Sequence, residues 1–189
     1  MKIISSLEAT VLGLLSEQSM HPYQMEKIVQ ERDMRYWTEL SMSSIYKVLR
    51  QLEKSGFVRA TIGVSAQNRS RKTYELTEEG RSALKEKILE IVSQPEHLIH
   101  RFDIGASNLG VLSHEEAGGA LVRYRDALTE KLAGYKALES FMNGQGCPQH
   151  SLALARRPQF LLKAEIDFIN DYIERLNTDR SKGEPAHEQ

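Results

Sequence analysis

The sequence is poor in the residues and segments that mark disulfide-rich and membrane proteins. Its 189 residues include one cysteine, Cys147, so no disulfide can form within the chain and no cysteine-rich zinc site can be built. Apolar runs are short: the run from Val11 to Leu15 is far below the roughly 20 residues that span a bilayer. Both observations favour a water-soluble protein of the reducing cytoplasm.

A large excess of one charge sign is also missing. The formal net charge is −1, which excludes a blanket of positive charge like that of a histone. Any affinity for an acidic polymer must therefore come from a local patch. Hydrophobic residues make up 40% of the chain, enough for a true core, and the length suits one or two small domains.

Apolar periodicity predicts helices in the N-terminal part, with one hairpin between the third and the fourth. Gly56 is suited to end the third helix in a left-handed conformation. The expected elements are, in order, a helix from Ser5 or Ser6, a helix from Pro22, a helix within 41–55, a hairpin around 65–71, and a helix that starts after Thr77 and stops before Pro95.

Composition changes near Pro95, and two long helices are expected beyond it. Ser113 and Glu116 form a capping-box pattern that opens the first of them. The second follows a turn at 143–150 and runs to about Leu176. Two apolar stripes line the second helix, one of them formed by Leu162, Ile166, Ile169, Ile173 and Leu176, and the other by Leu161, Ala164, Phe168 and Tyr172.

An apolar surface this wide exceeds what one neighbouring helix covers, so we expect a second subunit to contact it. The alternative is a helix buried inside one compact domain. The predicted fold is mainly α with a small β-hairpin. The predicted domains are a winged helix-turn-helix at 1–94, a helical dimerisation domain at 95–178 that is also a possible effector domain, and a disordered tail at 179–189.

Positive charge gathers in one segment. Between Ser41 and Tyr74 there are seven basic residues and one acid, Glu53, which gives this segment a charge of +6 and the remainder −7. Such segregation is what phosphate binding requires of a protein that is nearly neutral overall. The order of three helices, a hairpin and a helix is that of a winged helix-turn-helix, whose third helix enters the DNA major groove.

Spacing within the third helix supports this interpretation. Ser43, Lys47, Arg50 and Lys54 recur at helical spacing on the side opposite the apolar stripe. Their cationic groups can reach phosphates or guanine edges. The alternative is a solvated face, but such faces normally mix both signs of charge. The basic hairpin tip at 68–72, with Arg69, Arg71 and Lys72, favours DNA.

Three aromatic residues lie near this surface. Tyr46 sits at the edge of the apolar stripe, where it either packs or offers its hydroxyl to a phosphate, and Tyr23 is similar. Trp37 precedes the third helix. A lone tryptophan beside an apolar helix is usually buried, so core packing is expected of Trp37 ahead of ligand binding.

Several stretches resemble the PadR-like family of transcriptional regulators. They are HPYQM at 21–25, SSIYKVLRQLEKSGFV at 43–58, RSRKTYELTEEGR at 69–81 and, less specifically, FDIGASNLGVLSHEEAGGALVRYRDAL at 102–128. The resemblance implies a sequence-specific homodimeric repressor that binds a palindromic operator and that a small-molecule effector releases. It implies DNA contacts by Tyr23, Ser44, Tyr46, Lys47, Arg50, Arg69 and Lys72, and packing of the first helix, with Leu7 and Val11, on the C-terminal helices.

An effector pocket is expected between the winged domain and the C-terminal helices, and a small aromatic compound is the expected ligand. The candidate lining residues are Trp37, His97, His100, Phe102 and Tyr124. The C-terminal helices lack tryptophan, which argues against the tryptophan-lined drug site of short multidrug-responsive members.

No cofactor, metal or catalytic activity is expected. His97 and His100 are three residues apart, a spacing that can hold a metal, but an ordinary polar helix–loop junction is the simpler interpretation. Cys147 has no cationic cluster nearby in the sequence that would make it a redox switch. No Ser–His–Asp grouping has a supporting context. The remaining alternative function is a winged helix that binds only proteins.

Overall fold

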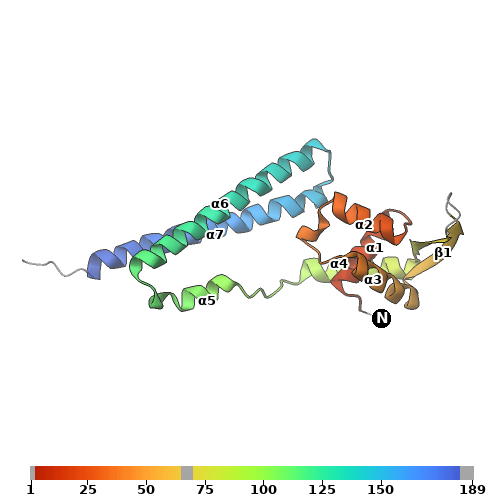
Figure 1. Cartoon of the computed structure of the whole chain (residues 1–189), viewed down its shortest axis with the longest axis horizontal. Coiled ribbons are helices and arrows are strands. Elements are labelled where there is room, and N and C mark those ends of the chain that lie inside the picture. Colours follow the sequence, from red (N-terminus) through yellow and green to blue (C-terminus); the bar gives the residue numbers. More distant parts are fainter. Residues whose placement is uncertain (1–2, 65–69, 184–189) are drawn as a thin grey trace, which may run out of the picture. The chain divides into compact units, whose positions relative to one another are not determined.

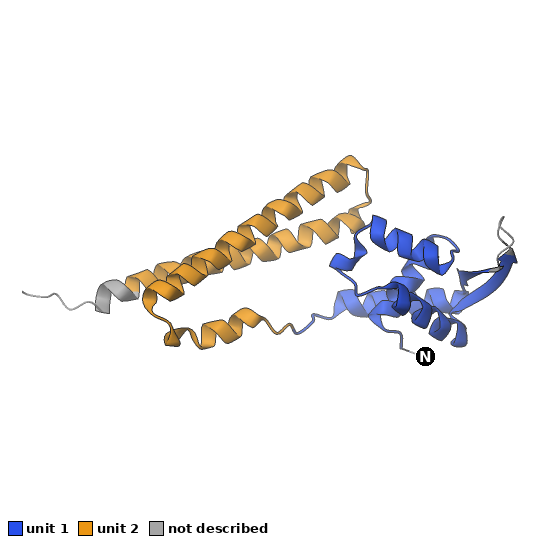
Figure 2. Cartoon of the chain, viewed as in Figure 1, with its two compact units in different colours: residues 1–97 blue, residues 98–189 orange. Residues whose placement is uncertain are grey.

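The computed structural model describes residues 3–64 and 70–183, and the chain divides into two compact units, residues 1–97 and 98–189 (Figure 2). Helices dominate both units, and the described sheet has two strands. The predicted fold class, mainly α with a small β-hairpin, is confirmed. No helix in the described ranges is long and apolar enough to cross a membrane.

The first unit has the element order expected from the sequence (Figure 1). Side-chain oxygens of Ser5, Ser41 and Thr77 cap three of its helices by accepting backbone N–H bonds. Its elements are α1 (Ser6–Glu17), α2 (Pro22–Glu31), the short 3-10 helix η1 (Met34–Tyr36), α3 (Met42–Lys54), β1 (Val58–Val64), β2 (Ser70–Leu76) and α4 (Glu78–Ser93).

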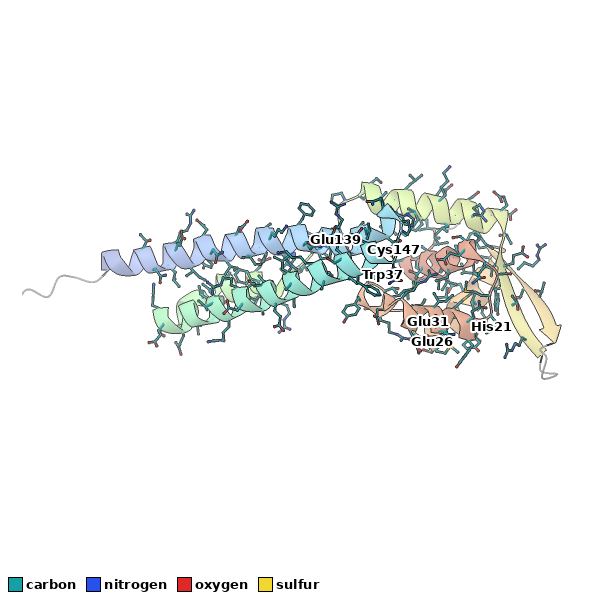
Figure 3. All side chains as sticks on the ribbon, turned by 90° about the horizontal axis from the view of Figure 1, so that it is seen from above. His21, Glu26, Glu31, Trp37, Glu139 and Cys147 are labelled. Carbon is teal, nitrogen blue, oxygen red and sulfur yellow. The ribbon has the colours of Figure 1, made fainter. Side chains whose placement is uncertain are left out.

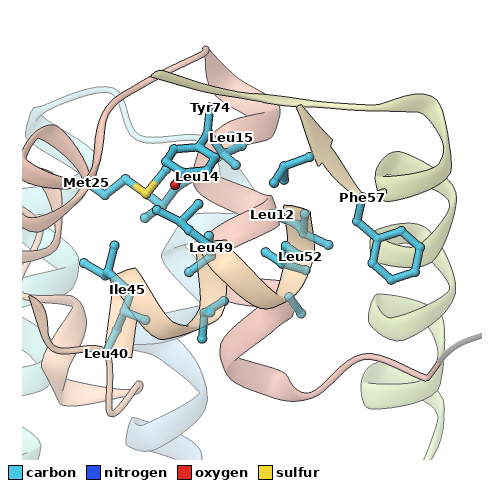
Figure 4. Packing of buried hydrophobic residues seen from close by; sticks show 14 of the residues in the cluster. Leu12, Leu14, Leu15, Met25, Leu40, Ile45, Leu49, Leu52, Phe57 and Tyr74 are labelled. Carbon is cyan, nitrogen blue, oxygen red and sulfur yellow. The ribbon is translucent and has the colours of Figure 1, made fainter. Parts of the chain in front are cut away.

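One hydrophobic core holds this unit together (Figure 4). Leu12 of α1 and Leu49 and Leu52 of α3 are completely buried in it. Each such side chain contributes about 1.5–3 kcal/mol when removed from water. The apolar stripe of α3 therefore fixes the helix against α1 and determines which of its residues remain outside.

Two glycines shape the junction between α3, the hairpin and α4. Gly56 has a φ of +76°, the left-handed conformation expected after the end of α3. At Gly80, a Cβ atom would lie 2.0 Å from the backbone oxygen of Phe57, so no larger residue fits without a shift. Thr77 adds a hydrogen bond from its hydroxyl to the Gly56 oxygen at 2.8 Å.

The second unit begins with a segment that the sequence predicts only as irregular. It contains helix α5 (Arg101–Ser107) and the 3-10 helix η2 (Leu109–Val111). Two long helices follow, α6 (His114–Gly144) and α7 (Gln149–Gly183), and the capping box of Ser113 and Glu116 is present at the start of α6.

Helix α7 is longer than predicted. The sequence pattern predicts an end near Leu176 and a disordered tail from 179, but the helix continues to Gly183. Once a helix has formed, each further residue adds a hydrogen bond at little cost, so a polar continuation needs no apolar periodicity. At the start of this continuation, the Thr178 hydroxyl donates to the Glu174 backbone oxygen, one turn back, at 2.8 Å. The tail residues 184–189 lie outside the described ranges.

Helices α6 and α7 pack side by side as an antiparallel hairpin (Figure 1). The first predicted stripe of α7 faces α6: Ile169 is completely buried, and Leu162 and Ile173 pack beside it. One polar group lies among these contacts. The buried Gln159 amide donates to the carboxylate of Glu139 on α6 at 2.7 Å, which compensates for the burial of Gln159. Glu139 is labelled in Figure 3.

Two residues predicted to contact the C-terminal helices or a second copy, Val11 and Ile169, have no exposed surface, whereas Leu7 is only partly buried. Val11 and Ile169 are fully buried, in the core of the first unit and in the α6–α7 hairpin respectively, and Leu7 packs against the same core as Val11. Val11 and Ile169 have no surface left to offer a second copy. Sequence periodicity identified them as apolar but could not tell which neighbour covers them.

Candidate nucleic-acid interface

Helix α3 is divided cleanly between a buried and an exposed side. Ile45, Leu49 and Leu52 are fully buried, whereas Lys47 and Arg50 lie on the outside. Because the buried side is held by the core, the exposed side is a fixed surface. Its members are Ser43, Tyr46, Lys47, Arg50, Gln51 and Lys54, and we call it the α3 outer face.

The cations of the α3 outer face have no acidic partner among the described residues. Lys47, Arg50 and Lys54 make no ion pair with any described residue. The Nε atom of Arg50 reaches only the backbone oxygen of Tyr46, at 3.4 Å. Three uncompensated cations on successive turns of one helix create a positive stripe that suits a phosphate backbone.

Exposed cations at helix α2 show the opposite behaviour. Lys27 and Glu31 lie one turn apart on α2 with 3.4 Å between their charged atoms, and Arg32, just after its end, binds both carboxylate oxygens of Glu17 at 2.7 Å. This bond to Arg32 lowers the pKa of Glu17. The lack of pairing on the α3 outer face therefore distinguishes it from the neighbouring helix.

The start of α3 is occupied by its own cap. The Ser44 hydroxyl accepts from the backbone N–H of Ser41 at 2.7 Å and donates to the Ser41 carbonyl at 2.8 Å. Ser44, assigned to DNA contact by the family resemblance, is therefore engaged in holding the helix start. Ser43 is exposed and lies near the Ser41 hydroxyl at 3.1 Å.

The basic residues of the hairpin behave differently from one another. Arg71 is exposed and pairs with no described acid. Lys72 donates to the Glu53 carboxylate of α3 at 2.7 Å, which raises the pKa of Lys72. The third predicted wing residue, Arg69, lies outside the described residues.

Two tyrosines extend the candidate interface. Tyr23 and Tyr46 expose 68% and 47% of their surfaces, so neither is a core residue. Tyr23 stacks loosely on His21, whose Nδ1 accepts the Gln24 backbone N–H at 3.0 Å and so caps α2. Both phenols are exposed enough to reach a ligand.

The core prediction for Trp37 is wrong. Its side chain, labelled in Figure 3, is 48% exposed. Met34 and Leu40 fill the core on either side of it, and the intervening segment runs over the surface. Arg35 holds this segment through the Leu40 carbonyl at 3.3 Å and an ion pair to Glu26. Nothing in the sequence pattern indicated that pairing.

The residues proposed for the effector pocket are only partly gathered. The rings of Phe102 and Tyr124 stack with centroids 5.0 Å apart, and Phe168 meets Phe102 edge-on at 6.1 Å. His97 and His100 are exposed. Burial and the nearby Glu165 carboxylate raise the pKa of Tyr124. The second unit therefore supplies an aromatic cluster from two of the five predicted residues.

An open depression of about 320 Å³ lies on the surface of the second unit. Tyr172 joins it to the aromatic cluster, because its ring lies 5.9 Å from that of Phe168 and also lines the depression. The other lining residues are Ala106, Leu109, Gly110, Leu112, His114, Ala117 and Leu176, none of which was predicted. In the described ranges, no group of three acidic, histidine or cysteine residues could hold a metal ion.

Comparison with known proteins gives a consistent picture. Residues 11–86 match the model of the transcriptional regulator PadR-like family. The negative transcriptional regulator PadR of Bacillus subtilis (strain 168) is 25% identical over 133 residues, which cover 70% of this chain and 71% of that protein.

Solved structures agree in fold. Bacillus subtilis PadR in complex with operator DNA matches with a TM-score of 0.73 and 20% identity, covering 91% of this chain and 99% of that one. The same protein in complex with p-coumaric acid matches with a TM-score of 0.74 and 18% identity, covering 90% of this chain and 95% of that one. The virulence activator AphA of Vibrio cholerae matches with a TM-score of 0.65 and 21% identity, covering 92% of this chain and 99% of that one.

Proposed function

We propose, from the match of residues 11–86 to the model of the PadR-like family of transcriptional regulators, that this chain binds operator DNA as a homodimer and represses transcription. The DNA-binding surface consists of the α3 outer face and the β1–β2 wing. The family is one of regulators, not of enzymes, and the proposed compartment is the cytoplasm, where its DNA partner would lie.

The observation that carries the proposal is the unpaired cationic stripe of Lys47, Arg50 and Lys54. Helix α2 pairs Lys27 with Glu31, whereas none of these three neighbouring cations pairs with a described acid. A stripe that stays uncompensated on a rigid helix is suited to an external polyanion. Tyr23, Tyr46, Ser43 and Arg71 are exposed and add further donors to the proposed surface.

A second copy would cover the exposed stripe of α7. Leu154, Leu161 and Phe168 recur every seven residues, so they line one side of the helix, and each is about half exposed. Homodimeric binding would present two α3 helices to the two halves of a palindromic site. Half-site centres are then expected about 10 base pairs apart, or a multiple of that.

Release by a small aromatic compound is the proposed mode of control. The Phe102–Tyr124–Phe168 cluster and the adjoining depression offer ring surfaces and the phenolic hydroxyl of Tyr124. Bacillus subtilis PadR was solved with p-coumaric acid, a ligand of the same chemical class. A Tyr124→Leu variant that still answers to every aromatic acid effective on the wild type would refute this assignment.

The test of DNA binding compares two lysine variants of the full chain. Duplexes that the wild type enriches from a random pool serve as operator, and fluorescence anisotropy gives the affinity. Lys47→Gln should weaken binding by at least about fivefold, as expected for loss of a base or phosphate contact worth about 1–3 kcal/mol. Lys85→Gln removes one charge from α4, away from the α3 outer face, and should change little.

The competing function is a winged helix that binds only other proteins. It predicts no enriched DNA sequence and tolerance of charge reversal at Lys47 in DNA assays. It leaves the unpaired cations of α3 without a polyanionic partner, whereas the operator proposal gives each of them a phosphate or base within reach.

A further inference from the structure

The base of the wing is attached to the rest of the first unit on two sides. On one side, Tyr74 of β2 exchanges backbone hydrogen bonds with Met20 at 3.0 and 3.1 Å. On the other, the Lys72 ammonium group donates to the Glu53 carboxylate of α3 at 2.7 Å. The same ammonium group lies 5.3 Å from the ring centre of Tyr74.

Strand register explains why Lys72 reaches α3 while Arg71 does not. Lys72 pairs with Ile62 and Tyr74 pairs with Ala60, so Lys72 and Tyr74 occupy the same face of the hairpin. Tyr74 is buried against the core, which identifies this as the inner face. Arg71 belongs to the opposite face.

Glu53 is an unexpected residue for a surface that binds phosphates. It is the only acid between Ser41 and Tyr74, and it lies next to Lys54 in the sequence. A carboxylate there lowers the attraction for DNA unless its charge is used locally. An exposed pair of this kind adds only about 0–1 kcal/mol to folding, so stability alone is a weak reason for it.

We propose that the Glu53–Lys72 pair positions the wing against recognition helix α3, and that Lys72 acts through this pair without binding a phosphate. The proposal rests on the proposed function, operator binding by α3 and the wing. It revises the role of Lys72, which sequence reasoning assigned to direct DNA contact.

Positioning and phosphate contact have different consequences. Operator recognition requires α3 and the wing to fit the duplex together, whereas binding to random DNA depends mainly on charge. A positioning pair therefore affects the preference for operator over random DNA. A phosphate contact affects both duplexes and the salt dependence of binding.

The sign of one substitution separates the two roles. If Lys72 were a phosphate contact restrained by Glu53, Glu53→Gln would free it and tighten binding. If the pair positions the wing, Glu53→Gln weakens operator binding even though it removes a negative charge. Lys72→Gln should weaken operator binding to a similar degree, up to about fivefold for each protomer, as expected for an exposed pair whose two members act as a unit.

The experiment measures affinity for a selected operator duplex and a random duplex over a salt series, by fluorescence anisotropy, with the full chain. The variants are Glu53→Gln, Lys72→Gln and the exchange of Glu53→Lys with Lys72→Glu, and Lys85→Gln is the control. Both single variants should lose operator affinity and keep random-duplex affinity. The exchange should regain operator affinity to within about threefold of wild type, because the pair is restored in reverse.

Two outcomes would overturn the proposal. If Lys72→Gln weakens both duplexes and lowers the salt slope by about 0.9 for each protomer, Lys72 contacts phosphate and only the operator function stands. An exchange variant that folds with the wild-type melting temperature but does not regain affinity would show that the pair does not position the wing. A wild-type chain that enriches no sequence removes the operator function, and the positioning role with it.

Discussion

The core around α3 and the surface of α7 differ in how completely they bury their apolar residues. In the first, α1, α3 and the hairpin enclose Leu12, Leu49 and Leu52 entirely. In the second, α7 covers one stripe with α6 and leaves Leu161 and Phe168 about half exposed. The core around α3 is closed within one chain, although the end of α4 leaves Leu89 and Val92 exposed, whereas the open stripe of α7 is suited to a second copy.

Charge shows a parallel contrast. Helices α2 and α7 each contain a cation paired with an acid one turn away, Lys27 with Glu31 and Arg175 with Asp171. Helix α3 leaves Lys47, Arg50 and Lys54 unpaired among the described residues. Both contrasts lead to the same conclusion. The exposed apolar stripe of α7 and the unpaired cations of α3 mark the surfaces at which partners are proposed to bind.

The largest effect is expected inside the closed core. Leu49→Ala should lower the free energy of unfolding by about 2–5 kcal/mol, because it leaves a cavity that the packed neighbours cannot fill. Chemical denaturation followed by circular dichroism measures this. Leu161→Ala makes the same substitution on the exposed stripe of α7 and is the matched control. Its loss of unfolding free energy within the protomer should be below that range. Equal losses would contradict the contrast between the two cores.

A smaller effect is expected at the open stripe. Phe168→Asp should raise the dissociation constant of the dimer at least about 30-fold, the range of a central interface residue worth about 2 kcal/mol or more. Sedimentation equilibrium measures this. Lys163→Asp is the control: it lies on the same helix but about half a turn round from Leu161, so it should leave the dissociation constant of the dimer nearly unchanged. A Phe168→Asp protein with wild-type association would show that a second copy does not cover this stripe.

The start of α6 offers a change of about 1 kcal/mol, the usual cost of losing a helix cap. Ser113→Ala removes the side chain that accepts the Glu116 backbone N–H. The melting temperature of the second unit's transition should fall. Ser140→Ala, an exposed position further along α6, should leave it unchanged or raise it slightly. Equal behaviour of the two variants would contradict the capping role.

The smallest effect is a pH dependence at the same cap. The backbone N–H of Ser113 donates to Glu116 at 2.8 Å and lowers the pKa of Glu116 below its ordinary value of 4.5. Because the folded pKa is the lower one, this contribution to stability is present above pH 4.5 and disappears as the pH falls through the folded value. Denaturation of wild type and Glu116→Gln at neutral and at acidic pH measures the difference, which should shrink in acid. A constant difference would contradict it.

Local patterns predicted much of this structure. The apolar stripe and Gly56 defined α3, and Ser113 with Glu116 defined the start of α6. The cationic residues of α3 followed from the same periodicity, because the buried side of a helix fixes which residues are outside.

Other features depended on contacts between distant residues. The pairing of Glu53 with Lys72 requires the strand register, which a two-residue periodicity alone does not specify. The exposure of Trp37 depends on Met34 and Leu40 having filled the core already. The last turns of α7 carry no apolar pattern, so only the structure reveals them.

The most direct test of the central claim is the salt dependence of operator binding by wild type and by a variant with Lys47, Arg50 and Lys54 all changed to Gln. If the unpaired stripe of a dimer meets the phosphate backbone, the slope of log affinity against log salt should fall by up to about 5, and operator affinity should drop with it. A variant that keeps the wild-type slope and affinity would show that the cations of α3 do not contact DNA.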